Sequence, residues 1–294
     1  MKEIDKKTPL FKSLLCLFSV TILIFNSVSV DSNSFQSTRS EAMGGVRPDF
    51  RGEGSGGFLN PASMGSTGPP VFYMDYSGEE PSEIKGAAEI RLIRRLNISV
   101  LAGRRDNDMK IYGAGLAGRI LSGTPDTYLN IGASAKIITG AGQSYQCMQC
   151  GEEDKDRGEA GTGSIGAIFR PFPSFSLRYI GQFPFDSRYE EALSVKGNIH
   201  RAGMSFYISS GVLISLEREY REDGTKANHY GFNLQTGLPL EIMTGYFDGS
   251  VSAGIRASWN SFRSSIVFSE RDESNIHTRV SLEYVPEGND RGYR

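Results

Sequence analysis

The sequence predicts an all-β protein, a transmembrane antiparallel β-barrel of about 14 strands with an N-terminal segment inside it. The composition is the first observation, because 35 Gly, 17 Phe and 13 Tyr among 294 residues favour many short strands. The second is that short runs from residue 70 onward alternate apolar and polar residues, without a convincing helical period. The third is that no stretch after residue 29 approaches 18 apolar residues, so a mature membrane form would have to cross with strands.

The first 29 residues are typical of an export signal. Lys2, Lys6 and Lys7 give a basic start, and residues 14–25 form an uncharged apolar run. As a helix this run would extend about 18 Å, short of the ~30 Å hydrocarbon core of a bilayer. Small residues at Ser27 and Ser29 then suit cleavage. We expect a signal peptide over 1–29, with an uncleaved anchor as the alternative.

Charge and hydropathy exclude other classes of protein. The formal net charge is −2, which gives no reason to expect nucleic acid as a partner. The mean hydropathy of −0.31 excludes a bundle of membrane helices.

The C-terminal strands show the alternation best. Over residues 251–259, Val251, Ala253 and Ile255 alternate with polar residues that include Arg256. Successive strand side chains point to opposite faces, so one face is apolar and the other polar. A soluble sandwich would bury the apolar face, whereas a membrane barrel would turn it toward lipid. Periodicity alone does not choose between them.

Two further features favour the barrel. Aromatic residues recur at strand ends, as at Tyr246, Trp259 and Tyr284, which suits the girdles where lipid meets water. Tight connections also alternate with longer ones such as 141–158 and 185–199. We expect strands to start near residues 70, 86, 97, 110, 126, 160, 174, 200, 211, 228, 239, 250, 262 and 275. The barrel then spans 70–285 with a tail at 286–294, and an even count places both ends on the periplasmic side.

Residues 30–69 are rich in Gly, Ser and Pro and have little periodicity. We expect this segment to fold inward as a hatch, since glycines allow tight turns in a crowded lumen. A disordered periplasmic leader is the alternative, although apolar residues such as Val46 and Leu59 argue against plain disorder.

Two parts of the chain resemble a known superfamily. The stretches Ser40–Val46 and Gly57–Gly65 resemble the N-terminal signature of FadL-like outer-membrane barrels. Residues 240–282 resemble its PorV/PorQ branch, although Glu241-Ile242 stands where a Leu-Arg pair is usual. The resemblance implies a 14-stranded barrel in the outer membrane of a Gram-negative-type cell envelope. It also implies a hatch motif made by Met43, Gly44, Gly45, Phe58, Asn60 and Pro61.

Charged residues on the polar strand faces are candidates for lining the lumen. These candidates are Glu89, Arg91, Arg119, Arg178, Glu217, Glu241, Arg256 and Arg279. They could line a substrate path, or they could form ion-pair ladders that fill the barrel and pin the hatch. We favour the ladders.

The sequence offers little catalytic or metal chemistry. Cys147 and Cys150 form a CxxC pair, for which an exported chain favours a loop disulfide over a redox or zinc site. The acidic run 152–156 lacks the spacing of an EF-hand and is more typical of a solvated loop than of a Ca²⁺ site. The sequence contains no P-loop, nucleophile elbow or HExxH motif, so we expect no catalytic residue, metal or cofactor.

Two functional hypotheses follow from the resemblance. The first is a conduit for small hydrophobic molecules across the outer membrane, and we expect inward apolar residues at Leu101, Ile111, Ile168, Ile180 and Met243 to line it. The second is a PorV/PorQ-like barrel that transports nothing and serves as a scaffold for secretion or surface assembly. Its partners, besides outer-membrane lipid, would be secretion-machinery or surface proteins at loops 141–158 and 185–199.

Overall fold

The computed structural model describes most of the barrel and part of the N-terminal segment. The described residues are 37–47, 54, 56–66, 70–78, 82–93, 95–105, 109–124, 127–139, 159–184, 197–209, 211–272 and 275–286. The predicted signal peptide over 1–29, the tail after 286, the acidic run, Cys147 and Cys150 all lie outside these residues.

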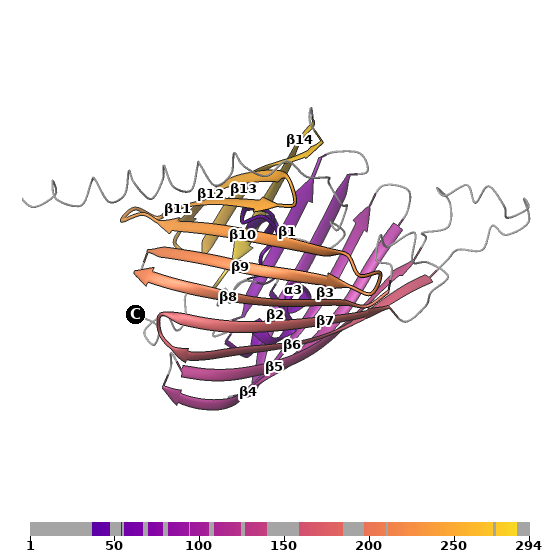
Figure 1. Cartoon of the computed structure of the whole chain (residues 1–294), viewed down its shortest axis with the longest axis vertical. Coiled ribbons are helices and arrows are strands. Elements are labelled where there is room, and N and C mark those ends of the chain that lie inside the picture. The colour runs from indigo at the N-terminus through magenta and orange to yellow at the C-terminus, as the bar shows by residue number, and fades with distance from the viewer. Residues whose placement is uncertain are drawn as a thin grey trace, which may run out of the picture.

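Fourteen antiparallel strands form a closed barrel in which each strand pairs with its neighbours in sequence (Figure 1). The strands are β1 (Val71–Ser77), β2 (Glu83–Ile93), β3 (Leu96–Arg105), β4 (Met109–Thr124), β5 (Thr127–Thr139), β6 (Glu159–Phe172), β7 (Phe175–Pro184), β8 (Ile199–Ser209), β9 (Val212–Arg221), β10 (Lys226–Gln235), β11 (Leu240–Phe247), β12 (Ser250–Trp259), β13 (Phe262–Asp272) and β14 (Asn275–Tyr284). Pairing of β1 with β14, with Phe72 opposite Tyr284, closes the ring. The predicted antiparallel barrel of 14 strands is therefore confirmed.

The alternating pattern located the strands well. The largest difference is at β2, which was expected near residue 86 and begins at Glu83. The reason is that the alternation already begins at Glu83. Ile84, Gly86 and Ala88 face outward, whereas Glu83, Lys85 and Ala87 face inward. The charges at 83 and 85 hid this start from a search for apolar residues.

The apolar strand face points outward and the polar face points inward. In β1, Phe72, Met74 and Tyr76 are 46%, 51% and 51% exposed, whereas Asp75 and Ser77 are buried. The same alternation continues in β5, where Ile131 and Ile137 point outward and polar side chains of the same strand are buried. A soluble sandwich would have the reverse polarity, so the structure selects the membrane barrel.

The two long connections are both on one rim of the barrel. On the rim with both barrel ends, β2–β3, β6–β7 and β12–β13 are joined by residues 94–95, 173–174 and 260–261. On the other rim, the β5–β6 and β7–β8 connections span 140–158 and 185–198, whereas β11–β12 and β13–β14 are joined by only two residues each. Long connections confined to one rim are typical of bacterial outer-membrane barrels, but the predicted alternation holds only at these two connections.

Aromatic rings make a continuous series across the closing seam. Trp259 stacks on Phe262 with ring centroids 6.3 Å apart, and Phe262 lies 5.0 Å from Tyr284. Tyr284 in turn lies 6.3 Å from Phe72, so the series joins β12, β13, β14 and β1. The predicted girdle therefore has a structural counterpart at this rim.

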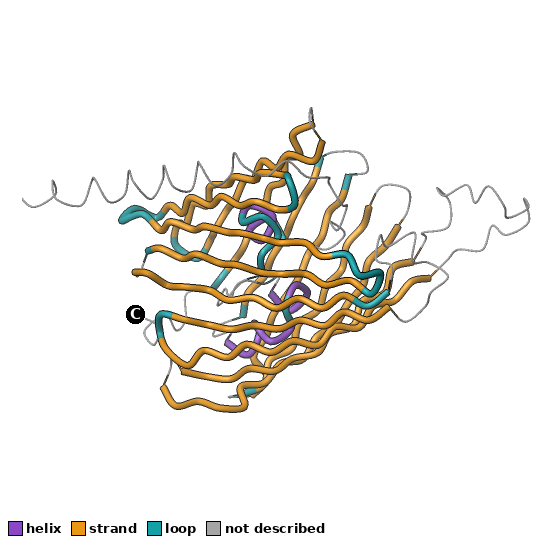
Figure 2. The backbone as a smooth tube through the Cα atoms, viewed as in Figure 1, coloured by secondary structure: helices purple, strands orange, loops and turns teal. Residues whose placement is uncertain are grey.

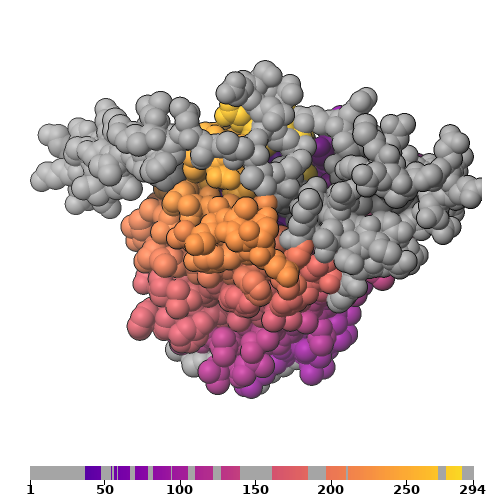
Figure 3. All heavy atoms as spheres, turned by 45° about the vertical axis from the view of Figure 1, so that its right-hand side comes forward, coloured from indigo at the N-terminus to yellow at the C-terminus, as the bar shows by residue number. Residues whose placement is uncertain are grey.

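Three short helices lie within the ring of strands (Figures 1 and 2). They are α2 (Thr38–Ala42), α3 (Gly56–Leu59) and the 3₁₀ helix η1 (Pro61–Ser66). None of the helices in the described ranges has the length and apolarity needed to cross a bilayer. In the space-filling view the magenta and orange strands form one continuous outer surface (Figure 3).

Candidate functional site

The lumen holds two separate pieces of the N-terminal segment. We call residues 37–47 the first plug segment and residues 56–66 the second plug segment. Helix α2 of the first packs against β11, β12, β13 and β14, whereas η1 of the second packs against β3, β4, β5 and β6. The two segments therefore contact different parts of the inner wall.

The first plug segment starts with a capped helix held by β1. Ser37 is the N-cap of α2, and its hydroxyl accepts a hydrogen bond of 3.2 Å from the Ser40 amide. The Thr38 hydroxyl donates to Asp75 at 2.6 Å, and the Tyr73 hydroxyl donates to the same carboxylate at 2.5 Å. This buried cluster fixes the start of α2 against the wall.

Glu41 anchors the end of α2 on β13 and β14. Its carboxylate accepts hydrogen bonds from His277 Nδ1 at 2.9 Å and Ser269 Oγ at 2.5 Å, and it pairs with Arg279 Nε at 3.2 Å. Burial by itself would raise the pKa of Glu41, but Arg279 and the hydrogen bonds from His277 and Ser269 outweigh burial and hold the pKa at about 2. Glu41 is thus a plug carboxylate held ionised by the barrel wall.

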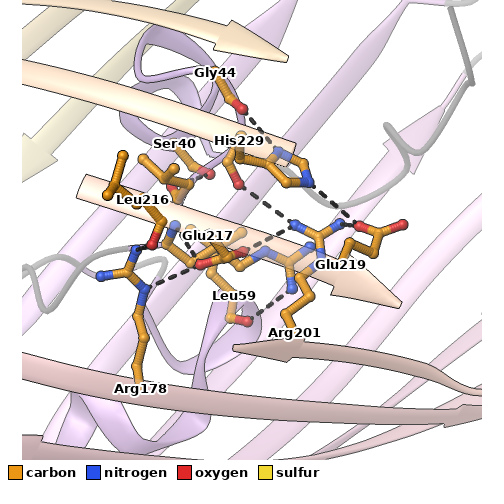
Figure 4. Close-up of polar contacts among 12 residues, drawn as sticks. Ser40, Gly44, Leu59, Arg178, Arg201, Leu216, Glu217, Glu219 and His229 are labelled. Carbon is orange, nitrogen blue, oxygen red and sulfur yellow. Dashed lines mark hydrogen bonds and ion pairs between the residues drawn. The ribbon is translucent and has the colours of Figure 1, made fainter. Parts of the chain in front are cut away.

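The backbone that follows α2 reaches a charged network on β7 to β10 (Figure 4). His229 Nδ1 donates to the Gly44 carbonyl at 2.9 Å, and Arg201 Nη1 donates to the Gly45 carbonyl at 3.4 Å. The Arg47 amide donates to Glu217 Oε2 at 3.3 Å. These contacts bind the plug backbone to charged side chains of the wall.

The network itself consists of buried ion pairs among residues of β7, β8 and β9 (Figure 4). Glu217 on β9 pairs with Arg178 Nε at 3.0 Å and with Arg201 Nη1 at 3.4 Å. Glu219 pairs with Arg201 and also accepts from Arg221 Nε at 2.6 Å. The Arg178, Arg201, Glu217 and Glu219 side chains are at most 1% exposed, so loss of one partner would leave a buried charge uncompensated.

A pair of wall glycines makes room for the first plug segment. Gly231 on β10 and Gly245 on β11 lie directly opposite each other. A Cβ atom at Gly245 would overlap the backbone of Met43 and Gly44, and one at Gly231 would lie 2.8 Å from the Met43 carbonyl. Gly44 has a φ of +67°, a backbone conformation that suits glycine. We call Gly231 and Gly245 the first glycine pad.

A second pair of glycines receives the second plug segment. Gly132 on β5 and Gly166 on β6 are also directly opposite each other. A Cβ atom at Gly132 would overlap the Pro61 backbone, and one at Gly166 would overlap the Asn60 side chain. We call Gly132 and Gly166 the second glycine pad. At both pads the wall has no side chain, and backbone and side-chain atoms of the plug segments fill the space.

The second plug segment is held by hydrogen bonds with two neutral amides and two charged side chains. Asn130 Nδ2 donates to Ser66 Oγ at 2.7 Å, and Asn97 Nδ2 donates to the Met64 carbonyl. Glu89 accepts from the Gly57 amide at 2.8 Å. Arg47 Nη1 donates to the Leu59 carbonyl at 3.0 Å and so links the two plug segments.

The residues predicted for the hatch motif lie in these two segments. Met43, Gly44 and Gly45 belong to the first, and Asn60 and Pro61 belong to the second. Phe58 lies in α3, also in the second segment. The structure places the other five residues inside the ring of strands, and their movement as a hatch stays a prediction.

Most of the predicted lumen-lining charges are buried on the inner wall. This group comprises Glu89, Arg178, Glu217, Glu241, Arg256 and Arg279. Arg119 is half-buried with its guanidinium 4.7 Å from the centre of the Tyr128 ring. Arg91 differs from the others because it is exposed near the end of β2, close to the rim. The predicted apolar set is also buried, namely Leu101, Ile111, Ile168, Ile180 and Met243.

Sequence reasoning missed several residues that connect plug and wall. Glu41 and Arg47 of the first plug segment were not among the expected site residues, nor was His229. The available signal was the presence of single charges on either side of the small-residue stretch 42–45. Within the described ranges, no cluster of His, Cys, Asp and Glu side chains could hold a metal ion.

Comparison with known proteins relates the chain to solved structures only. No protein-family model and no curated protein sequence matches the chain. Solved structures that resemble it include a TodX monoaromatic hydrocarbon channel mutant, with a TM-score of 0.59 and 9% identity over 87% of this chain and 100% of that one. A Pseudomonas aeruginosa FadL homologue gives a TM-score of 0.54 and 8% identity over 88% of this chain and 100% of that one. The Acinetobacter baumannii outer membrane protein Omp33 gives a TM-score of 0.53 and 8% identity over 74% of this chain and 98% of that one. The fold is therefore that of outer-membrane barrels, including FadL-like ones.

Proposed function

We propose that the chain is an outer-membrane conduit for small hydrophobic molecules and that its plug segments act as the hatch. The observation that carries this proposal is the pair of glycine pads, where the wall has no side chain and backbone and side-chain atoms of the plug segments fill the space. A wall built solely as a solid core would fill such positions with its own side chains. Here the filling belongs to a different part of the chain, which can leave without unfolding the barrel.

Apolar side chains on the inner wall support a hydrophobic cargo. Ile111, Ile168 and Ile180 are buried on strands β4, β6 and β7, on the side of the barrel that contacts the second plug segment. An apolar solute lowers its free energy when it leaves water and buries its surface against apolar side chains such as these. We therefore place the route along this part of the wall, and we take monoaromatic hydrocarbons as the test class because one similar structure is described as their channel.

The test is uptake through a lipopolysaccharide-containing outer membrane. The chain is produced in a porin-deficient Gram-negative host, and its location is checked by fractionation and by its shift on gels after heating. Uptake of radiolabelled toluene should exceed that of cells with an empty vector. A variant in which residues 56–66 are replaced by a Gly-Ser linker should take up toluene faster still. Uptake equal to the empty vector for both proteins would contradict the proposal.

A non-transporting scaffold of the PorV/PorQ type is the second candidate. The buried ion pairs around Glu217 favour it, because they fix the first plug segment to the wall. A scaffold predicts that neither the native chain nor the linker variant raises toluene uptake, although both reach the outer membrane. The same experiment therefore separates the two candidates.

A further inference from the structure

The inner wall next to the second plug segment carries a row of serines. Ser99 on β3 lies opposite Gly115 on β4, and Gly115 lies opposite Ser134 on β5. Ser134 in turn lies opposite Ser164 on β6. The three serines therefore occupy one level of the wall, and Gly115, which has no side chain, lies between Ser99 and Ser134.

The hydroxyl groups of this row are buried and unpartnered. Ser99, Ser134 and Ser164 are 1%, 8% and 3% exposed, and among the described residues their oxygens have no hydrogen-bond partner. On β8 and β9, by contrast, Ser205 and Ser215 hydrogen-bond to each other at 2.7 Å. Buried hydroxyls are normally hydrogen-bonded, so three unpartnered ones on one level indicate a place for a group that the chain itself does not supply.

Met64 of the second plug segment lies against this row. A Cβ atom built on Gly115 would be 2.9 Å from Met64 Cε and 2.8 Å from Ser99 Oγ. A Cβ atom built on Gly57 would be 2.6 Å from Ser99 Oγ and equally close to the Met64 sulfur. The fully buried Met64 side chain thus lies between two glycines and beside a hydroxyl that it cannot satisfy, because a thioether donates nothing and accepts weakly.

The chemistry of the row selects a neutral ligand. Its three side chains carry hydroxyl groups only, and Glu89, the acidic residue near Gly57, already accepts the Gly57 amide. Lys136 lies one level further along β5, outside this row, and has an interaction of its own. A neutral hydroxyl or carbonyl group would gain hydrogen bonds here, whereas a bare hydrocarbon would gain none.

We propose that Ser99, Ser134 and Ser164 form a subsite for the neutral hydrogen-bonding group of a small apolar solute, and that Met64 fills this subsite when the plug is in place. The proposal deepens the conduit function and rests on it. It narrows the cargo from hydrocarbons in general to apolar molecules that carry a hydroxyl or carbonyl group. The flexible thioether of Met64 suits a side chain that is displaced and returns.

The test compares toluene with benzyl alcohol, which share an apolar frame and differ by a hydroxyl group. Both probes are radiolabelled and supplied well below saturation to porin-deficient cells that express the full chain. The S99A/S134A/S164A variant should lower benzyl alcohol uptake at least about threefold relative to toluene uptake, as expected for the loss of one or more hydrogen bonds. The M64A variant should raise the uptake of both probes.

The matched control is S265A/S281A, which removes two buried inward serines that face each other on β13 and β14. It should leave the uptake ratio of the two probes unchanged. Equal effects of the S99A/S134A/S164A variant on both probes, or no effect, would overturn the subsite while leaving the conduit intact. An M64A variant with native uptake would overturn the role of Met64. If the native chain raises the uptake of neither probe, the conduit function itself is overturned. The shift of each variant on gels after heating shows that the variant is folded.

Discussion

The two plug segments lie in the same lumen and each covers a glycine pad, but the wall holds them in different ways. Charged wall groups contact the first segment, with Arg279 paired to Glu41 and Glu217 accepting from the Arg47 amide. The second makes single hydrogen bonds with the amides of Asn97 and Asn130 and with the carboxylate of Glu89. We interpret the difference as one between an anchored region and a region that is more easily displaced.

Magnitudes support this division. Breaking a buried ion pair from one side costs about 3–5 kcal/mol, whereas a neutral hydrogen bond contributes about 1 kcal/mol. The polar contacts of the second segment are thus weaker individually, and several hydroxyls around it have no partner among the described residues. We therefore expect the second segment to leave the wall first, with Arg47 as the link to the anchored one.

The strongest test of the anchored region is Glu217→Gln. The substitution leaves Arg178 and Arg201 without a full counter-charge in a buried site, and we expect the free energy of unfolding to fall by about 3–5 kcal/mol. Equilibrium urea unfolding in lipid vesicles measures this change. A loss below about 1 kcal/mol would show that the network contributes little to holding the plug and wall together.

Acid should weaken the same region through Glu41. Its folded-state pKa is about 2, below the value of about 4.3 for an unfolded chain, so its stabilising effect is complete above pH 5 and is lost as pH falls toward 2. The effect amounts to about 3 kcal/mol. The difference in unfolding free energy between the native chain and Glu41→Gln should therefore shrink between pH 5 and pH 2. A difference that does not vary with pH would contradict the assignment.

The glycine pads allow a matched comparison of the two regions. Gly245→Val and Gly132→Val each place a side chain where plug backbone now lies, at an expected cost of about 1–3 kcal/mol. Gly132→Val should raise toluene uptake more, because the second segment yields more easily. Higher uptake for Gly245→Val would reverse the roles of the two segments.

The smallest expected effect belongs to Asn130→Ala. This change removes the hydrogen bond to Ser66 and should cost about 1 kcal/mol. Thermal unfolding followed by the gel shift should show a small decrease in Tm together with faster toluene uptake. A loss as large as that of Glu217→Gln would remove the contrast between the two regions.

The sequence predicted the barrel far better than it predicted the plug contacts. Strand positions follow from a local period of two, so the positions of β12, β13 and β14 were expected at the residues where they begin. The contact between Gly44 and Gly245, or between Glu41 and His277, joins residues about 200 apart in sequence, and no local pattern encodes it. The many glycines were taken as signs of turns and short strands, whereas four of them form pads in the strand interior.

Site-specific cross-linking tests the division between the two segments most directly. In a chain whose native cysteines are replaced by serine, G65C/N130C ties the second segment to β5, and A42C/G254C ties the first to β12. A Cβ built on each glycine lies 2.9 Å from the Cβ of its partner, which is shorter than the ~3.5–4.5 Å of a disulfide, so each pair needs a small shift apart to form the bond. Oxidation of G65C/N130C should abolish toluene uptake and reduction should restore it, whereas A42C/G254C should form its disulfide and leave uptake unchanged. Uptake that survives the first cross-link, or that is lost only with the second, would contradict the account.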